Sequence, residues 1–146
     1  MQFQRVNRTN AEKAFGVCVN EHSATITGNY PVLFIAANAS SNDGYKVQGN
    51  LSADLRLFAG IADADIAQGA VGLYQCYGYR DSVYIYALTT SETIAAGAAL
   101  GPGATGSPGL SSLGLTATFM PVVAMQAIGA TVNSPGGYAK AFIRAL

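Results

Sequence analysis

The chain has 146 residues, of which half are apolar and only 11% are charged, and its eight basic residues balance its eight acidic residues. A chain of this length fits one domain with one well-packed core, and zero net charge removes the long-range field that draws nucleic acids or anionic membranes to a protein. No apolar run approaches the about 20 residues of a membrane-spanning helix. We therefore expect neither a nucleic acid nor a membrane as partner, whereas sparse charge favours association with other proteins.

The N-terminal segment differs in character from the rest of the chain. The stretch "MQFQRVNRTNAEKAF" is polar and slightly basic, and it lacks the apolar core of a signal peptide. We interpret residues 1–24 as an N-terminal arm whose side chains Phe3, Arg5, Arg8 and Phe15 contact a partner and become ordered on binding. A frayed, solvated terminus is the alternative interpretation.

Along the remaining chain, apolar residues recur at every second position, which is typical of strands. Segments rich in β-branched and aromatic residues alternate with connections rich in Gly, Asn, Ser and Pro. The expected strands are 30–37, 45–49, 55–62, 98–101, 118–128 and 138–146. Only residues 62–67 and 91–96 could form short helices. The sequence predicts an all-β fold, a compact β-barrel or β-sandwich of short antiparallel strands, as a single domain over residues 25–146 behind the arm.

The stretch "VGLYQCYGYRDSVYIYAL", residues 71–88, predicts two further strands. Asp81 within "YRDS" is a turn former, so an antiparallel hairpin is the simplest interpretation. The hairpin would carry five tyrosines, Tyr74, Tyr77, Tyr79, Tyr84 and Tyr86. They could fill a core or form an interface, since tyrosine is favoured in both places, and alternation suggests that one face serves each purpose.

One short pattern recurs in the connections. "ADIAQGAVGL" and "ETIAAGAAL" share the frame Ile-x-x-Gly, which begins at Ile66 and at Ile94, and "TITGNYPVL" is a looser third copy. Each copy places an apolar anchor before a tight turn, in which a glycine can adopt positive φ, and a new strand follows. We interpret the pattern as one turn structure used at several corners of a barrel.

Polar residues offer three candidates for chemistry. Asp63 and Asp65 lie two apart, but no calcium-loop pattern follows them, so we expect turn residues that cap the segment "IAQG" rather than metal ligands. His22 is the only histidine, and no nucleophile motif accompanies it, so we expect an exposed polar residue. Cys18 and Cys76 lack the spacing of a zinc site and are expected to be buried free thiols.

The string "GPGATG", residues 101–106, matches the glycine spacing of a dinucleotide fingerprint. That fingerprint requires a following helix and an acidic residue about 20 positions later. Here "SPGLSSLG" follows, and no Asp or Glu occurs after Glu92. We therefore interpret it as a surface loop, and the sequence predicts no cofactor.

Several segments in order carry a resemblance to a known family. They are "SSNDGYKVQGN" (40–50), "LFAGIADADIAQGAVGLYQCYGYRDSVYI" (57–85), "TIAAGAALG" (93–101), "VVAMQAIGA" (122–130) and "AFIRAL" (141–146). In this order the chain resembles the small capsid decoration, or cement, proteins of tailed bacteriophages. The resemblance covers roughly residues 25–146 and rests on turn glycines and apolar alternation. Residues 1–24 have no clear counterpart in that family.

The resemblance implies a structural virion protein, made in the host cytoplasm, with no catalysis and no cofactor. It would bind the outer surface of an assembled capsid, bridge neighbouring major capsid subunits and thereby stabilise the shell. The partners implied are the major capsid protein and other copies of the chain in a homotrimer. The residues that we expect to contact partners are Phe3, Arg5, Arg8, Phe15, Tyr77, Tyr79, Tyr84 and Tyr86.

Two other classes of function remain as alternatives. A soluble carbohydrate- or ligand-binding β-sandwich, such as a host-surface adhesion domain, could use the tyrosines as a stacking platform, although the chain has no Trp. A small hydrolase could use Asp63, Asp65 or Asp81, but the sequence places no acid–base pair around them. The hydrolase is the least favoured of the three.

Overall fold

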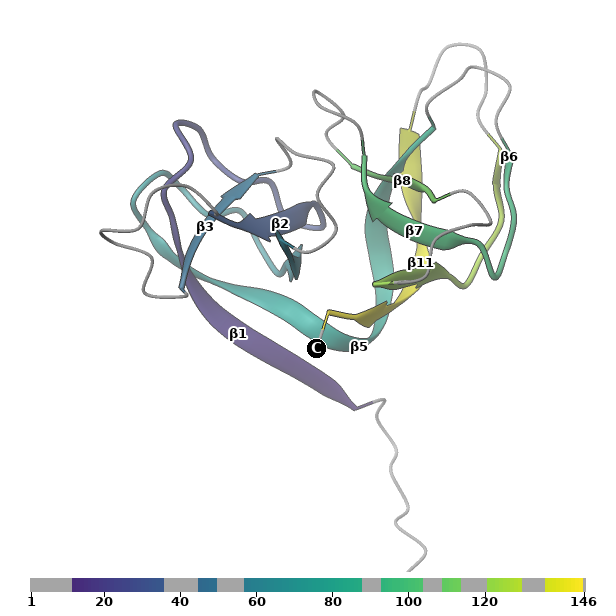
Figure 1. The fold of residues 1–146 in the computed structure, drawn as a ribbon, viewed down its shortest axis with the longest axis horizontal. Coiled ribbons are helices and arrows are strands. Elements are labelled where there is room, and N and C mark those ends of the chain that lie inside the picture. The colour runs from purple at the N-terminus through teal and green to yellow at the C-terminus, as the bar shows by residue number, and fades with distance from the viewer. Residues whose placement is uncertain are drawn as a thin grey trace, which may run out of the picture.

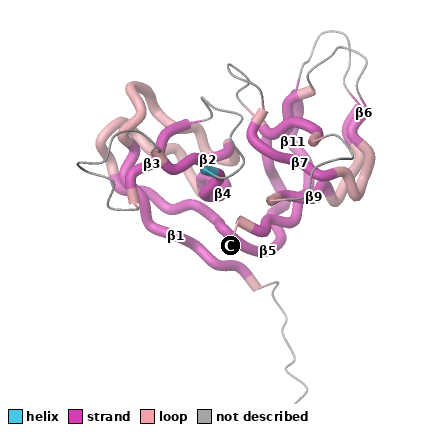
Figure 2. Tube along the Cα trace, in the orientation of Figure 1, coloured by secondary structure: helices cyan, strands magenta, loops and turns pink. Residues whose placement is uncertain are grey.

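The computed structural model describes residues 12–35, 45–49, 57–87, 93–103, 109–113, 121–129 and 136–145. Its strands are β1 (Lys13–Asn20), β2 (Pro31–Phe34), β3 (Lys46–Gly49), β4 (Phe58–Ala62), β5 (Val71–Tyr86), β6 (Thr93–Ile94), β7 (Ala99–Pro102), β8 (Leu110–Ser112), β9 (Val122–Ala124), β10 (Ile128–Gly129) and β11 (Gly136–Arg144). Apart from one residue of 3-10 helix at Leu57, the described residues hold no helix (Figure 2). The predicted all-β class is confirmed, and residues 62–67 and 93–96 form turns and strand rather than helix.

Nine strands form one mixed sheet in the order β1-β3-β2-β4-β5-β11-β9-β7-β8, and β6 pairs with β10 in a separate ladder. Most neighbours are antiparallel, but β1 runs parallel to β3, and β5 runs parallel to β8. Three details differ from the predicted compact barrel or sandwich of short antiparallel strands. The sheet is mixed and does not form a single closed barrel, and β5 alone is 16 residues long.

The sheet contains the same five-stranded unit twice. In the first unit β1 pairs with β5 and β3, β2 with β3 and β4, and β4 with β5. In the second unit β5 pairs with β11 and β8, β7 with β8 and β9, and β9 with β11. Every parallel or antiparallel orientation is the same in both. Figure 1 shows the first unit on the left and the second on the right, joined by β5, which is the last strand of one and the first strand of the other.

The predicted recurring turn is confirmed after Ile66 and Ile94, whereas in the looser third copy Asn29 rather than Gly28 has the positive φ. The buried anchors Ile26, Ile66 and Ile94 each precede a four-residue turn, which a backbone hydrogen bond of 3.0–3.3 Å closes. The third turn residue has positive φ in each copy: 69° at Asn29, 72° at Gly69 and 87° at Gly97. Positive φ at this position is the signature of a type II turn, which selects glycine or asparagine.

The turns also dock in the same way within both units. The amide of the positive-φ residue donates to the carbonyl oxygen at the end of another strand: Asn29 to Ala62, Gly69 to Asn20 and Gly97 to Ala124. Each anchor also has a bridge partner: Ile26 pairs with Ile66, and Ile94 pairs with Ile128 of β10. A local sequence frame therefore corresponds to an element repeated throughout the fold.

The predicted hairpin at residues 71–88 is wrong, because β5 continues through "YRDS" without reversing. Along β11, two steps from Ala139 to Ala141 match three steps along β5 from Val83 to Arg80, so β5 contains a bulge near Asp81. A bulge moves the side chains that follow it to the other face of the strand. The buried positions accordingly change from Tyr74 and its even-numbered neighbours to Val83 and its odd-numbered neighbours.

The structure also differs from the predicted arm. Residues 13–20, which were assigned to it, form β1, and seven of them pair with β5. Residues 1–11, including Phe3, Arg5 and Arg8, lie outside the described residues.

The apolar interior consists of two clusters. The first-unit cluster contains Cys18, Ile26, Val32, Val47, Ala59, Ala62, Ile66, Tyr74 and Cys76. The larger cluster contains Phe58, Ile61, Val83, Ile85, Ile94, Leu100, Leu110, Val122, Ala124, Ala139, Ala141 and Ile143. All five residues of β4 are buried, and four of them belong to the clusters: Phe58 and Ile61 to the larger one, Ala59 and Ala62 to the first-unit cluster. The two units are thereby packed together through β4 as well as joined through β5.

Candidate functional site

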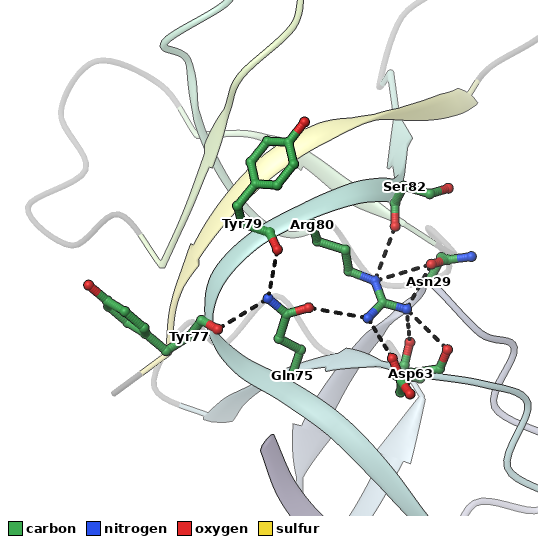
Figure 3. Close-up of polar contacts among 8 residues, drawn as sticks. Asn29, Asp63, Gln75, Tyr77, Tyr79, Arg80 and Ser82 are labelled. Carbon is green, nitrogen blue, oxygen red and sulfur yellow. Dashed lines mark hydrogen bonds and ion pairs between the residues drawn. The ribbon is translucent and has the colours of Figure 1, made fainter. Parts of the chain in front are cut away.

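The densest group of polar contacts surrounds Arg80, which lies in β5 where the two units meet (Figure 3). Its guanidinium donates to the side-chain oxygen of Asn29 at 2.8 and 3.1 Å, and to a carboxylate oxygen of Asp63 at 3.0 Å. It also donates to Gln75 Oε1 and to three backbone carbonyls, those of Ala62, Asp63 and Ser82. Arg80 is only 8% exposed, so its charge is removed from water and needs these acceptors.

The Arg80 contacts hold the chain together rather than forming a reactive group. They connect the turn before β2 and the loop after β4 to the middle of β5. Gln75 extends the network by donating to the carbonyls of Tyr77 and Tyr79, both at 3.1 Å. We name this set, Asn29, Asp63, Gln75 and Arg80, the Arg80 brace.

The two aspartates that were predicted to lie in a turn, Asp63 and Asp65, both contact other parts of the protein rather than a ligand site. Asp63 forms the ion pair with Arg80, and Asp65 Oδ1 accepts a hydrogen bond of 2.7 Å from the amide of Gly28. This contact joins the turn after Ile26 to the loop before Ile66. Both aspartates thus have structural contacts, but Asp65 holds the turn after Ile26 rather than the predicted segment "IAQG", and Asp63 serves the brace.

The tyrosines of β5 do not gather at one place. Tyr77 packs edge-on against Phe142, with ring centroids 5.4 Å apart. Burial raises the pKa of Tyr79, with a smaller contribution from its contact with Asp81. Tyr86 is half-buried at the end of β5.

Tyr84 belongs to an aromatic group of its own. Its ring is stacked on Tyr30 with centroids 4.5 Å apart, and Tyr138 meets it at a steep angle. Burial raises the pKa of Tyr30, and the neighbouring Tyr84 and Tyr138 raise it further. Tyr30 and Tyr84 each cover one face of the other's ring, and the most exposed ring of this group is that of Tyr138, which is 57% exposed. This arrangement weighs against the tyrosines as an extended sugar-stacking platform.

Both thiols are buried and free, as expected. Cys18 Sγ contacts the carbonyl of Gly72, and Cys76 Sγ contacts that of Ala14. Burial raises the pKa of the Cys18 thiol, which keeps it in the unreactive protonated form.

The single histidine is half-buried rather than exposed, so its expected exposure is wrong. The His22 amide donates to Asn20 Oδ1 at 2.8 Å, and this contact fixes the connection between β1 and Ile26. Nδ1 of His22 is buried without a hydrogen-bond partner in the part of the chain that the structure describes.

Four apolar side chains lie exposed together on the outer side of β1 and β5. Phe15 is 45% exposed, Val17 61%, Val71 69% and Leu73 46%. Val17 is the register partner of Leu73, so the two side chains project from the same side of the sheet, and alternation places Phe15 and Val71 there too. We name these four residues the apolar face.

The corresponding outer side of the second unit has different chemistry. There β5 takes the place of β1, and β11 takes the place of β5. The exposed side chains there include Asp81, Tyr138, Lys140 and Arg144. The same strand arrangement therefore carries charged side chains in the second unit, whereas in the first unit four apolar side chains lie between the charges of Lys13 and Glu21.

Of the residues predicted to contact partners, the structure places only Phe15 on this face. Sequence reasoning missed Val17, Val71 and Leu73. Their alternation was visible, but it could not tell which side of each strand would meet the core. The remaining predicted residues lie on β5 beyond the apolar face or outside the described residues.

No protein-family model and no curated protein sequence matches the chain. Among the described residues, no group of three or more His, Cys, Asp or Glu side chains could hold a metal ion. The part of the chain that the structure describes contains no helix long and apolar enough to cross a membrane. The features available for a functional proposal are thus the repeated unit, the Arg80 brace and the apolar face.

Proposed function

We propose that the protein is a structural virion protein that binds the outer surface of an assembled phage capsid and bridges neighbouring major capsid subunits. The observation that carries the proposal is the repeated unit: one chain holds two bodies of the same topology at a fixed separation. A bridge requires two contact regions in one rigid molecule. This observation adds to the sequence resemblance to decoration proteins.

The rigidity of the bridge comes from three features. The continuous strand β5 belongs to both units, β4 packs into both apolar clusters, and the Arg80 brace closes the junction between them. Binding two subunits through one stiff molecule makes the second contact intramolecular, which raises apparent affinity by roughly 10²–10⁴. Because such a protein binds only the assembled shell, it stabilises the shell by mass action.

Contact with the capsid is assigned to residues 1–11 and to the tyrosine-bearing part of β5. Co-sedimentation with undecorated capsids tests the assignment. Deleting residues 1–11 leaves β1 intact, since that strand begins at Lys13, and should weaken binding at least about tenfold if the segment supplies one of the linked contacts. An Arg5→Gln/Arg8→Gln variant is the matched control that separates charge from length. Undiminished binding of the deletion variant would remove the segment from the account.

The competing function is binding of a carbohydrate through the exposed ring of Tyr138. A glycan array distinguishes it from the capsid proposal. Glycan binding that Tyr138→Ser abolishes, together with no binding to capsids, would favour the competing function.

A further inference from the structure

We propose that the apolar face, formed by Phe15, Val17, Val71 and Leu73, is the site at which a second copy of this chain packs through a two-fold contact. The inference goes beyond the proposed function and does not depend on it. It concerns contact between two copies of the chain through the apolar face, whereas the proposed function concerns binding to the capsid.

The fold itself does not require this face to be apolar. The second unit has the same strands and pairings, and on the corresponding side it carries Asp81, Tyr138, Lys140 and Arg144. The two units act as an internal comparison, in which the architecture is constant and the outer side chains differ. Apolar groups kept in water at four adjacent positions are typical of a protein–protein contact.

Charges along β1 indicate that the partner is another copy. Lys13 and Glu21 lie at equal distances along the chain from Val17, one on either side, and both are exposed. Alternation places Lys13 and Val17 on the side of β1 that carries the apolar face. Glu21 directly follows β1 and contacts Lys46, the register partner of Val19, so it lies on that side as well. Two copies packed face to face, with antiparallel β1 strands and the axis at Val17, bring each Lys13 against the partner's Glu21.

A two-fold contact requires this kind of self-complementarity, because each surface must match itself after rotation. A row with basic, apolar and acidic residues in that order satisfies the requirement, whereas a row with two like charges would not. Glu21 already contacts Lys46 at 3.2 Å, and its side chain remains 44% exposed and so accessible to a second cation. Zero net charge over the whole chain removes long-range repulsion between copies.

The arrangement also predicts the size of the assembly. A two-fold contact closes after two copies, so the mass in solution should be about 30 kDa, twice the 15.0 kDa of one chain. The homotrimer implied by the sequence resemblance would have three copies. Sedimentation equilibrium across a range of concentrations distinguishes the two.

The test compares dimer dissociation constants of the wild type and of surface variants. Val17→Asp places a carboxylate at the axis and should weaken the dimer at least about 100-fold. Met125→Asp is the control, since Met125 is 52% exposed and lies outside the face, and it should leave the constant unchanged. Val71→Lys provides a second disruptive variant at the most exposed position of the face.

Charge reversal tests the two-fold geometry. Lys13→Glu and Glu21→Lys should each weaken the dimer by roughly five- to tenfold, because like charges then meet at both symmetry-related positions. The double variant Lys13→Glu/Glu21→Lys should associate more tightly than either single variant, because opposite charges meet again across the contact, although both variants that carry Glu21→Lys lose the pair with Lys46. Urea unfolding of each variant verifies that the fold is retained.

Four results would overturn the inference: a wild-type monomer at about millimolar concentration, a trimeric mass, wild-type association in both Val17→Asp and Val71→Lys, or no recovery in the charge-swapped double variant. Capsid co-sedimentation is measured separately on the same variants. A monomeric Val17→Asp protein that still binds capsids leaves the proposed function intact, and a dimeric wild type that never binds them leaves this inference intact.

Discussion

The guanidinium of Arg80 lies 3.0 Å from the carboxylate of Asp63, and this contact ties the second half of β5 to the loop that follows β4. The ion pair is asymmetric in its surroundings, since 10% of the Arg80 side chain and 46% of the Asp63 side chain are exposed. Substitution of the buried Arg80 should therefore lower the free energy of unfolding more than substitution of Asp63.

Arg80→Met should lower the free energy of unfolding by about 3 kcal/mol, because it leaves several buried oxygen acceptors without a donor. Asp63→Asn keeps an acceptor oxygen at a half-exposed position and should cost less than about 1 kcal/mol. Urea denaturation of both variants measures the difference. Equal costs for the two substitutions would show that Arg80 does not brace the junction.

The recurring turns predict a pattern of substitution costs. Gly69 and Gly97 have positive φ, and an added Cβ at either position would meet no atom within 4 Å. Alanine should therefore cost only the backbone penalty, about 1–2 kcal/mol. Asparagine should cost less than alanine, because Asn29 occupies the equivalent position in the third turn. Thermal unfolding of the four single variants tests the order, which a larger cost for asparagine would contradict.

Gly78 should be far less tolerant than the turn glycines. It also has positive φ, of 102°, but an added Cβ would collide with the backbone carbonyl of Glu12. Gly78→Ala should cost more than about 3 kcal/mol, since it combines backbone strain with overlap in the β1–β5 ladder. An unfolding free energy equal to that of Gly69→Ala would mean that β1 does not pack against β5 at this point.

Alkaline pH should destabilise the fold. Burial raises the pKa of Tyr74 above its ordinary value of 10.0, with Cys76 and Cys18 adding to the shift, and burial raises the pKa of Cys18 above 9.0. The unfolded chain then releases these protons first, so the stabilisation is complete below about pH 9 and is lost as pH rises through the folded-state values. Tyr74→Phe should reduce the fall in unfolding free energy between about pH 9 and 11. An unchanged slope would contradict the burial of this phenol.

The two thiols should react only when the chain opens. Cys18 and Cys76 are 0% and 7% exposed and lie in the first-unit cluster. A thiol-specific reagent should label neither residue rapidly in the native protein and both in denaturant. Rapid labelling of the native protein would show that the first unit opens readily.

How far the sequence predicts this fold depends on the range of the interaction involved. The turns after Ile66 and Ile94 were predictable, because each anchor lies close in the chain to its positive-φ glycine. The predicted strands before and after them are confirmed for the same reason, since their alternation is local. None of these features required knowledge of which strand pairs with which.

The errors all concern distant partners. Asp81 is typical of turns, but the sequence around it does not show that the neighbouring Arg80 is buried against Asn29 and Asp63. The segment is therefore a bulged strand rather than the predicted hairpin. Residues 13–20 were assigned to an arm because β5, the strand they pair with, begins only at Val71, far along the chain. The repeated unit was likewise hidden, because its two copies share pairings and turns rather than extended sequence.

The measurement that most directly tests the central claim, a rigid two-unit protein that bridges capsid subunits, is the heat stability of undecorated capsids with and without the protein. Light scattering follows shell disruption as the protein is added in increasing amounts. The account predicts that the disruption temperature rises with added protein until binding saturates. If the protein stays in solution at every concentration and the disruption temperature does not change, the protein does not bridge a capsid.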